Sequence, residues 1–118
     1  MVLAHFSSKP IAIRYIYMII IGELRFDWAP DKARKNLRKH GVAFEEACTI
    51  FGDENGILIH DPDHSHTEDR YLLLGMSAKT RLLVVSHTYR DEDRMIRIIS
   101  AWIAARKERQ QYGRMKLP

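Results

Sequence analysis

The hydrophobic positions of the chain follow a helical period in its first half and a strand pattern in its second. Four apolar residues recur at i, i+3, i+4 and i+7, the spacing of an amphipathic helix: Phe44, Ala47, Cys48 and Phe51. A preceding helix is expected over residues 31–39, because Pro30 suits a first helical turn and Gly41 a helix end. Further upstream, the segment from Met18 into Trp28 has the pattern of one extended strand.

From Gly56 onward, short aliphatic runs alternate with polar turns. These runs cover residues 56–60, 70–76, 81–89 and 94–99, and such a series predicts an antiparallel meander. Ser100 offers a side-chain oxygen where a final, charged helix would begin. The pattern therefore predicts an α+β fold, in which a small antiparallel sheet is combined with two N-terminal helices and a C-terminal helix.

The predicted hairpin over residues 70–89 also has an expected register. If residues 77–80 form a four-residue loop, Leu74 stands opposite Leu83 and Arg70 opposite His87. Directly opposed residues share one face of a sheet. We therefore expect Arg70 and His87 to lie together at one end of the hairpin.

Length, charge, cysteine content and the longest apolar run limit what kind of protein the chain can be. The 118 residues suffice for one domain, which we expect over residues 24–118, with residues 1–23 as an N-terminal extension leading into the first strand. The net charge of +4 permits an RNA partner without requiring one. A single cysteine excludes an internal disulfide, and the apolar run over residues 11–21 is too short to span a bilayer. We expect a cytoplasmic protein without a membrane partner.

The stretch from Arg94 to Tyr112 is the strongest candidate site, because it gathers basic groups and one carboxylate around a strand–helix junction. Such groups suit RNA cleavage without a metal, since RNA carries its own nucleophile, the 2′-hydroxyl. We assign phosphate charge to Arg70, Arg97 and Arg106, proton transfer to His87 or Glu108, and weaker RNA contacts to Lys39, His40 and Arg109.

Each assignment has a structural alternative. Arg97 is equally explained by an ion pair with an acidic neighbour, and Glu108 by ion pairs on a helix surface. The basic face of the helix over residues 31–39 is explained by solvation as well as by phosphate contact.

The sequence gives less support to a metal site, a nucleotide-binding loop or a serine hydrolase. The loop over residues 60–68 contains Asp61, Asp63, His64, His66 and Glu68, yet their spacing matches no standard metal site. Neither a glycine-rich phosphate loop nor a nucleophile elbow is found. We therefore expect no metal and no cofactor.

Several segments, taken in order, resemble a known family: Phe26-Asp27-Trp28, Asn36 to Val42, Phe44 to Ala47, Asp61 to His64, Glu68 to Arg70, Gly75, Arg81 to Val85, Arg97 to Ala101, Arg106 to Arg109, and Tyr112. The chain resembles the BrnT toxins of bacterial type II toxin–antitoxin systems over about residues 24–112. The resemblance implies a RelE-like fold and a ribonuclease that halts translation. It also implies a cognate BrnA-like antitoxin with a ribbon-helix-helix part, and a toxin–antitoxin hetero-oligomer that represses its own promoter.

The chain departs from the family pattern at two adjacent positions. Trp102 and Ile103 stand where the family keeps positive charge, and Ala43 stands where a serine often caps a helix. Trp102 therefore either stacks on an RNA base, weakens activity, or enlarges the antitoxin contact. Arg94, Trp102 and Tyr112 complete the expected RNA contacts. The alternative function is an inactive homologue that serves only as an antitoxin-binding co-repressor module.

Overall fold

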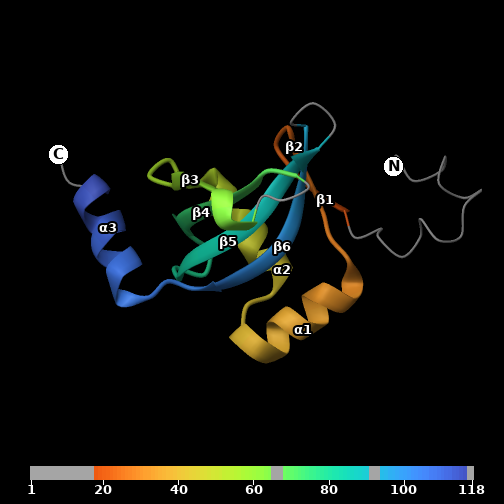
Figure 1. Ribbon diagram of the computed structural model, residues 1–118, viewed down its shortest axis with the longest axis horizontal. Helices are drawn as coiled ribbons and strands as arrows, with labels where there is room; N and C mark the ends of the chain where they lie inside the picture. Colours follow the sequence, from red (N-terminus) through yellow and green to blue (C-terminus); the bar gives the residue numbers. More distant parts are fainter. Residues whose placement is uncertain (1–17, 65–67, 91–93, 117–118) are drawn as a thin grey trace, which may run out of the picture.

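The computed structural model describes residues 18–64, 68–90 and 94–116, which form a six-stranded sheet with helices around it (Figure 1). The strand order is β1-β2-β6-β5-β4-β3. The strands are β1 (Met18–Ile21), β2 (Leu24–Asp27), β3 (Ile57–Asp61), β4 (Arg70–Met76), β5 (Leu82–Arg90) and β6 (Met95–Ile103). Within the described ranges, no helix is both long and apolar enough to cross a membrane.

The first strands correct two predictions. The expected single strand from Met18 to Trp28 is wrong, because the chain reverses at Gly22 and β1 pairs antiparallel with β2. Gly22 has φ +60°, a conformation that glycine adopts without steric cost. β2 then pairs parallel with β6. The sheet is therefore mixed rather than antiparallel, and the two predicted N-terminal helices follow two strands instead of the single expected strand.

Both of these helices occur close to the predicted residues. α1 (Pro30–His40) ends at Gly41, whose left-handed backbone lets its N–H donate to the Leu37 carbonyl. α2 (Phe44–Thr49) continues into the 3-10 turn η3 (Ile50–Gly52). The predicted amphipathic spacing is confirmed, because Phe44, Ala47 and Cys48 are buried in the core.

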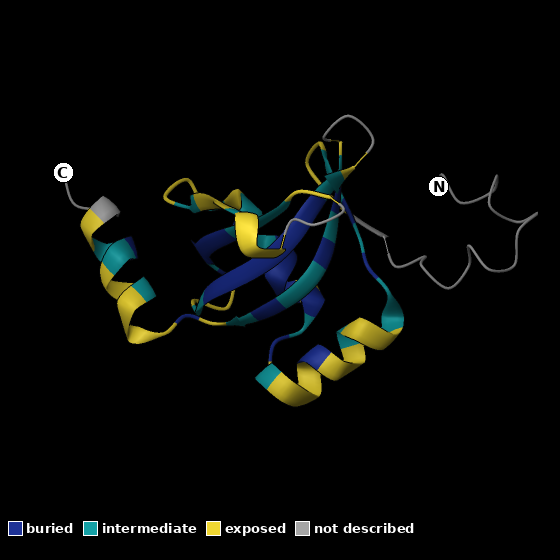
Figure 2. Ribbon diagram, viewed as in Figure 1, coloured by how far each residue is buried: buried dark blue, intermediate teal, exposed yellow. Residues whose placement is uncertain are grey.

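The main core lies between these helices and one face of the sheet. Figure 2 shows buried residues along the central strands and exposed ones on the outer surface of α1. Buried Asn36 of α1 accepts a hydrogen bond from the Ala101 N–H and donates one to the Ala101 carbonyl, at 3.0 and 2.8 Å. The pairing of β6 with β2 covers only the start of β6, and Asn36 satisfies backbone groups of β6 that lie beyond that pairing.

The hairpin of β4 and β5 is present, but its predicted register is wrong by one residue. Met76 pairs with Leu82 and Tyr71 with His87, so five residues connect the strands instead of four. The loop is closed by the Ser77 N–H donating to the Arg81 carbonyl, and Thr80 takes a positive φ of 59°. As a consequence Arg70 and His87 point to opposite faces of the sheet.

The junction at the end of the sheet also differs from the prediction. Ser100 does not begin a helix, because β6 continues through Ile103 and α3 (Arg106–Lys116) follows three residues later. The predicted C-terminal helix is confirmed, and it lies apart from α1 and α2 (Figure 1). It packs against the second face of the sheet in a small apolar cluster that includes Tyr112, Ala104, Leu74 and Val84.

Candidate nucleic-acid interface

The face of the sheet opposite α1 and α2 carries three successive rows of side chains. The register defines a row of Leu74, Val84 and Trp102, and a second row of Leu72, Ser86 and Ser100. Thr88 pairs with Arg97, and the same β4–β5 register extended by one residue places Arg70 opposite Thr88. From the α3 end outward, the rows change from apolar groups to hydroxyls and then to two arginines flanking a threonine.

A β-bulge in β6 makes the third row possible. His87 pairs with Ile98 and Ser86 with Ser100, so Ile99 is an extra residue without an opposite partner. Simple alternation would place Arg97 and Ser100 on opposite faces, since Ser100 is the third residue after Arg97. The bulge puts both on the same face.

Arg97 is held in a fixed orientation by an acidic neighbour. Its Nε and Nη2 donate to Oδ1 and Oδ2 of Asp27, each at 2.9 Å. The two side chains are only 23% and 15% exposed. The ion pair that was predicted as an alternative role for Arg97 is therefore present. Because the pair is bidentate, it fixes the plane of the guanidinium group and so orients Arg97 within the row.

Arg70 and Arg97 line one hollow of about 130 Å³ together with Lys32, Arg90 and Glu68. Arg90 Nη2 donates to both Glu68 carboxylate oxygens, at 3.1 and 3.2 Å. Positive groups therefore outnumber the single carboxylate in the lining. A hollow with this charge balance favours a phosphate group.

A second hollow of about 440 Å³ adjoins the first, because Arg70 lines both. Its other lining residues are Asp61, His64, Leu72, Ser86, Ser100 and Trp102. The Trp102 ring lies 6.2 Å from the ring of His40, centroid to centroid. This hollow therefore offers hydroxyls, an imidazole and an aromatic ring beside the arginine row.

Thr88, in the middle of the arginine row, has an unusual hydroxyl. The residue is fully buried. Within the part of the chain that the structure describes, its Oγ1 has no hydrogen-bond partner. Leaving a buried hydroxyl unpaired costs about 1–3 kcal/mol. Native proteins rarely retain such a group.

His87 does not join the row, contrary to the predicted pairing with Arg70. It lies in the core, where Nδ1 contacts the Val85 carbonyl at 3.0 Å and Nε2 contacts the Tyr89 hydroxyl at 3.2 Å. Burial lowers the pKa of His87 to about 4, against a smaller opposing effect of the Val85 hydrogen bond. His87 is therefore neutral at pH 7 and faces away from the arginines.

The predicted site residues on α3 are also remote from the row. Arg97 and Ile103 are six residues apart along β6, which corresponds to about 20 Å. Past that point Arg106 is exposed, Glu108 Oε1 accepts the Ala105 N–H at 2.6 Å, and Arg109 donates to the Ala104 carbonyl at 2.9 Å. The structure therefore separates the two ends of the stretch from Arg94 to Tyr112.

The remaining predicted RNA contacts are distributed differently. The Tyr112 hydroxyl donates to Asp53 Oδ2 at 2.6 Å, and burial, together with that carboxylate, raises its pKa to about 12. Tyr112 thus anchors α3 rather than facing solvent. Lys39 is exposed in the last turn of α1, and exposed Arg94 precedes β6. Only His40 and Trp102 of this group lie together.

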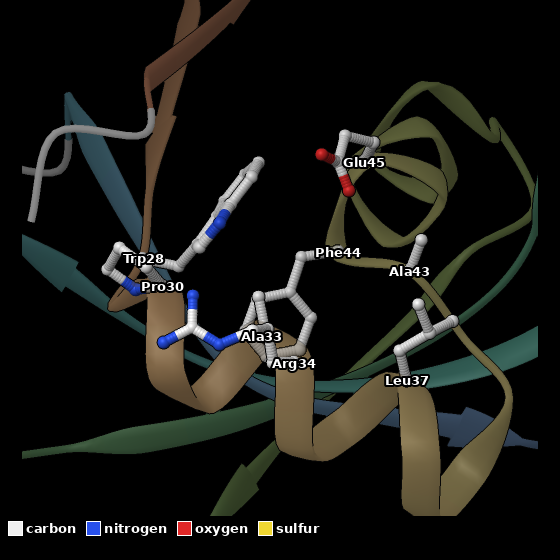
Figure 3. Close-up of a pocket in the computed structure, with 8 residues that line it drawn as sticks. All are labelled: Trp28, Pro30, Ala33, Arg34, Leu37, Ala43, Phe44 and Glu45. Atoms are coloured by element: carbon white, nitrogen blue, oxygen red, sulfur yellow. The ribbon is translucent and has the colours of Figure 1, made fainter.

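An apolar hollow of about 220 Å³ lies on the helical side, between α1 and α2 (Figure 3). Trp28, Leu37 and Phe44 line it, and Arg34 and Glu45 approach it from the two helices. Its lining is mostly carbon and holds one basic and one acidic group. It therefore lacks the excess positive charge that marks the arginine row.

Sequence reasoning missed Thr88 and Arg90 as site residues, together with the two serines of the second row, whereas Lys32 lies on the basic helix face for which phosphate contact was one alternative. No motif marks these residues. Their grouping follows from the hairpin register and the bulge, and neither is visible as a spacing in the sequence.

An open sheet face that carries arginines and hydroxyls is a surface whose groups can hydrogen-bond phosphate oxygens. Residues 28–108 match the family model described as "Ribonuclease toxin, BrnT, of type II toxin-antitoxin system". The chain belongs to this family of ribonuclease toxins, which implies an RNA substrate and an antitoxin partner. No curated protein matches the chain in a sequence search. The matched segment contains all three rows of the open face.

Proposed function

We propose that the chain is a metal-independent endoribonuclease that inhibits translation, with its site on the open sheet face. The observation that carries this proposal is the convergence of Lys32, Arg70, Arg90 and Arg97 on one hollow. In this mechanism the 2′-hydroxyl of the RNA attacks the adjacent phosphorus. The basic groups stabilise the charge that develops on the phosphate oxygens.

The register supports placing the phosphate at the row of Arg70, Thr88 and Arg97. A phosphate oxygen bound there accepts hydrogen bonds from the guanidinium groups. Thr88 itself is fully buried and lines neither hollow, so the arginines are the groups that a phosphate reaches. The Trp102 ring, next to the hydroxyl row, suits stacking on an unpaired base.

The antitoxin partner extends this proposal. We propose a BrnA-like ribbon-helix-helix antitoxin that neutralises the toxin, and a hetero-oligomer that represses its own promoter. The family match supports an antitoxin of some kind. In this account the RelE-like arrangement of the fold provides the open sheet face, and the toxin acts in the cytoplasm, where messenger RNA is translated.

Inducing the chain in bacteria without an antitoxin tests the activity. We expect growth arrest and degraded RNA, and we expect Arg70→Ala to relieve both, because it removes the arginine shared by the two hollows. Growth at the normal rate with intact RNA, despite verified expression of folded protein, would contradict the proposal.

The second candidate is an inactive co-repressor module, and the specific observation behind it is the pair Trp102 and Ile103. Trp102 lines the larger hollow, and Ile103 is exposed at the end of β6. Trp102→Arg separates the two functions. Toxicity that appears only in this variant favours the inactive module, whereas toxicity of the unchanged chain favours the ribonuclease.

A further inference from the structure

The larger hollow contains a histidine–carboxylate pair directly beside the arginine row. His64 Nδ1 lies 2.9 Å from Asp61 Oδ2. Both residues line the same hollow as Arg70, and Asp61 is also the β3 partner of Arg70 in the sheet register. The pair therefore sits next to the group that we propose binds phosphate.

The two members of the pair differ in exposure in a way that suits proton transfer. The Asp61 side chain is 16% exposed, whereas the His64 side chain is 66% exposed. Asp61 ends strand β3, so the sheet fixes its position, and His64 follows in the 3-10 turn η4 (Pro62–His64). When Nδ1–H donates to Asp61, the Nε2 lone pair is available on the accessible side of the ring.

We infer that His64, oriented by Asp61, is the general base of the ribonuclease reaction. This inference rests on the proposed function and gives proton transfer to a residue other than His87 or Glu108. His64 Nε2 takes the proton of the 2′-hydroxyl as the 2′-oxygen bonds to phosphorus. The bond from phosphorus to the 5′-oxygen breaks, and that oxygen takes a proton from water. The products are a 2′,3′-cyclic phosphate and a 5′-hydroxyl end.

The hydrogen bond between Asp61 and His64 can be weakened without changing the size of either side chain. Asp61→Asn keeps the shape of the group and removes its charge, so the hydrogen bond to His64 Nδ1 is no longer charge-assisted. The substitution therefore tests whether Asp61 orients His64.

The chain provides a matched control in a second histidine–carboxylate pair. His60 Nε2 lies 3.2 Å from Asp69 Oδ1, with the two side chains 46% and 69% exposed. Neither residue lines either hollow beside Arg70. The control therefore has the same chemistry on a neighbouring part of the surface.

The test measures cleavage of a short RNA by the purified chain across pH 5–9. We expect His64→Ala to slow cleavage at least about 100-fold and His60→Ala to leave it unchanged. Asp61→Asn should lower kcat at least about tenfold with KM nearly unchanged, because it weakens the hydrogen bond that orients His64, while Asp69→Asn changes neither. Unfolding curves establish that each variant is folded.

The outcomes distinguish a failure of the role inferred for His64 from a failure of the proposed ribonuclease function. If the unchanged chain cleaves RNA and His64→Ala cleaves it equally well, the inference fails and the proposed function stands. Equal losses in His64→Ala and His60→Ala would also overturn it. If the unchanged chain leaves RNA intact, the proposed function fails and the inference falls with it.

Discussion

Ionisable side chains in this protein have two roles, and the charges next to each side chain determine which role it has. In the core, Glu46 accepts hydrogen bonds from Ser77 and from Arg81, and the Arg81 hydrogen bond is the main reason that the pKa of Glu46 is lowered. Such pairs hold the fold together. On the open face, Arg70 and Arg97 surround a hollow that has more positive than negative groups. Equally charged residues therefore differ in role according to what faces them.

Buried His87 should make the free energy of unfolding depend on pH. This dependence tests whether His87 lies in the core, away from the candidate site. Its pKa of about 4 lies below the value of 6.5 for an unperturbed imidazole. Below pH 6.5 the unfolded chain gains a proton that the folded chain does not accept, so stability is lost as the pH falls from 6.5 towards 4. The expected loss is about 2 kcal/mol between pH 7.5 and pH 5.

Urea unfolding of the unchanged chain and of His87→Gln at both pH values measures this loss. We expect the part due to His87 to disappear in the variant, and RNA cleavage by folded variant at pH 7.5 to fall less than tenfold. Identical pH dependence in the two proteins would show that His87 titrates normally.

At the scale of elements, strand ends and helix ends determine which residues can meet. β6 carries Arg97 near one end and leads into α3 at the other, so the basic residues between Arg94 and Arg109 are divided between two places. Glu108 lies in the first turn of α3 and accepts the Ala105 N–H. This contact satisfies a backbone donor that the helix itself leaves unpaired.

Glu108→Ala is therefore expected to destabilise the protein without abolishing cleavage. Loss of the cap and of a favourable charge at the helix start costs about 1 kcal/mol. Lys107→Ala, one residue earlier in the same turn, is the control and should leave stability nearly unchanged. Urea unfolding together with an RNA cleavage assay makes the comparison. A large loss of cleavage in stable Glu108→Ala would assign that carboxylate to catalysis.

At the scale of the whole molecule, the sheet separates two surfaces. One face packs on α1, α2 and η3 and forms the main core. The other is covered by α3 near one end of the strands and carries the hydroxyl and arginine rows beyond it. Stability and proposed RNA binding are thus assigned to opposite faces of the same strands.

Local signals predicted the elements more successfully than their arrangement. Pro30 and Gly41 bound α1 because they act on the adjacent backbone alone, and β4 covers the predicted residues 70–76. The parallel pairing of β2 with β6 joins segments about 70 residues apart in the chain, and no local pattern encodes it.

The candidate site depended on features that sequence spacing does not show. Arg70 and Arg97 were predicted and the structure brings them to one hollow. The loop from Ser77 to Arg81 is one residue longer than expected, and this difference reverses the face on which His87 lies. The bulge at Ile99 then changes the alternation along β6. A shift of one residue in either strand is enough to regroup the side chains.

The central claim is that the open sheet face cleaves RNA without a metal, and cleavage of RNA by the purified chain in excess EDTA tests it most directly. Arg70→Ala is compared with Arg106→Ala, which replaces an exposed arginine at the start of α3, beyond the far end of β6. We predict cleavage in EDTA that leaves 2′,3′-cyclic phosphate ends, a loss of about 100-fold or more in Arg70→Ala, and near-normal cleavage in Arg106→Ala. Intact RNA with folded, unchanged chain, or an equal loss in both variants, would contradict the account.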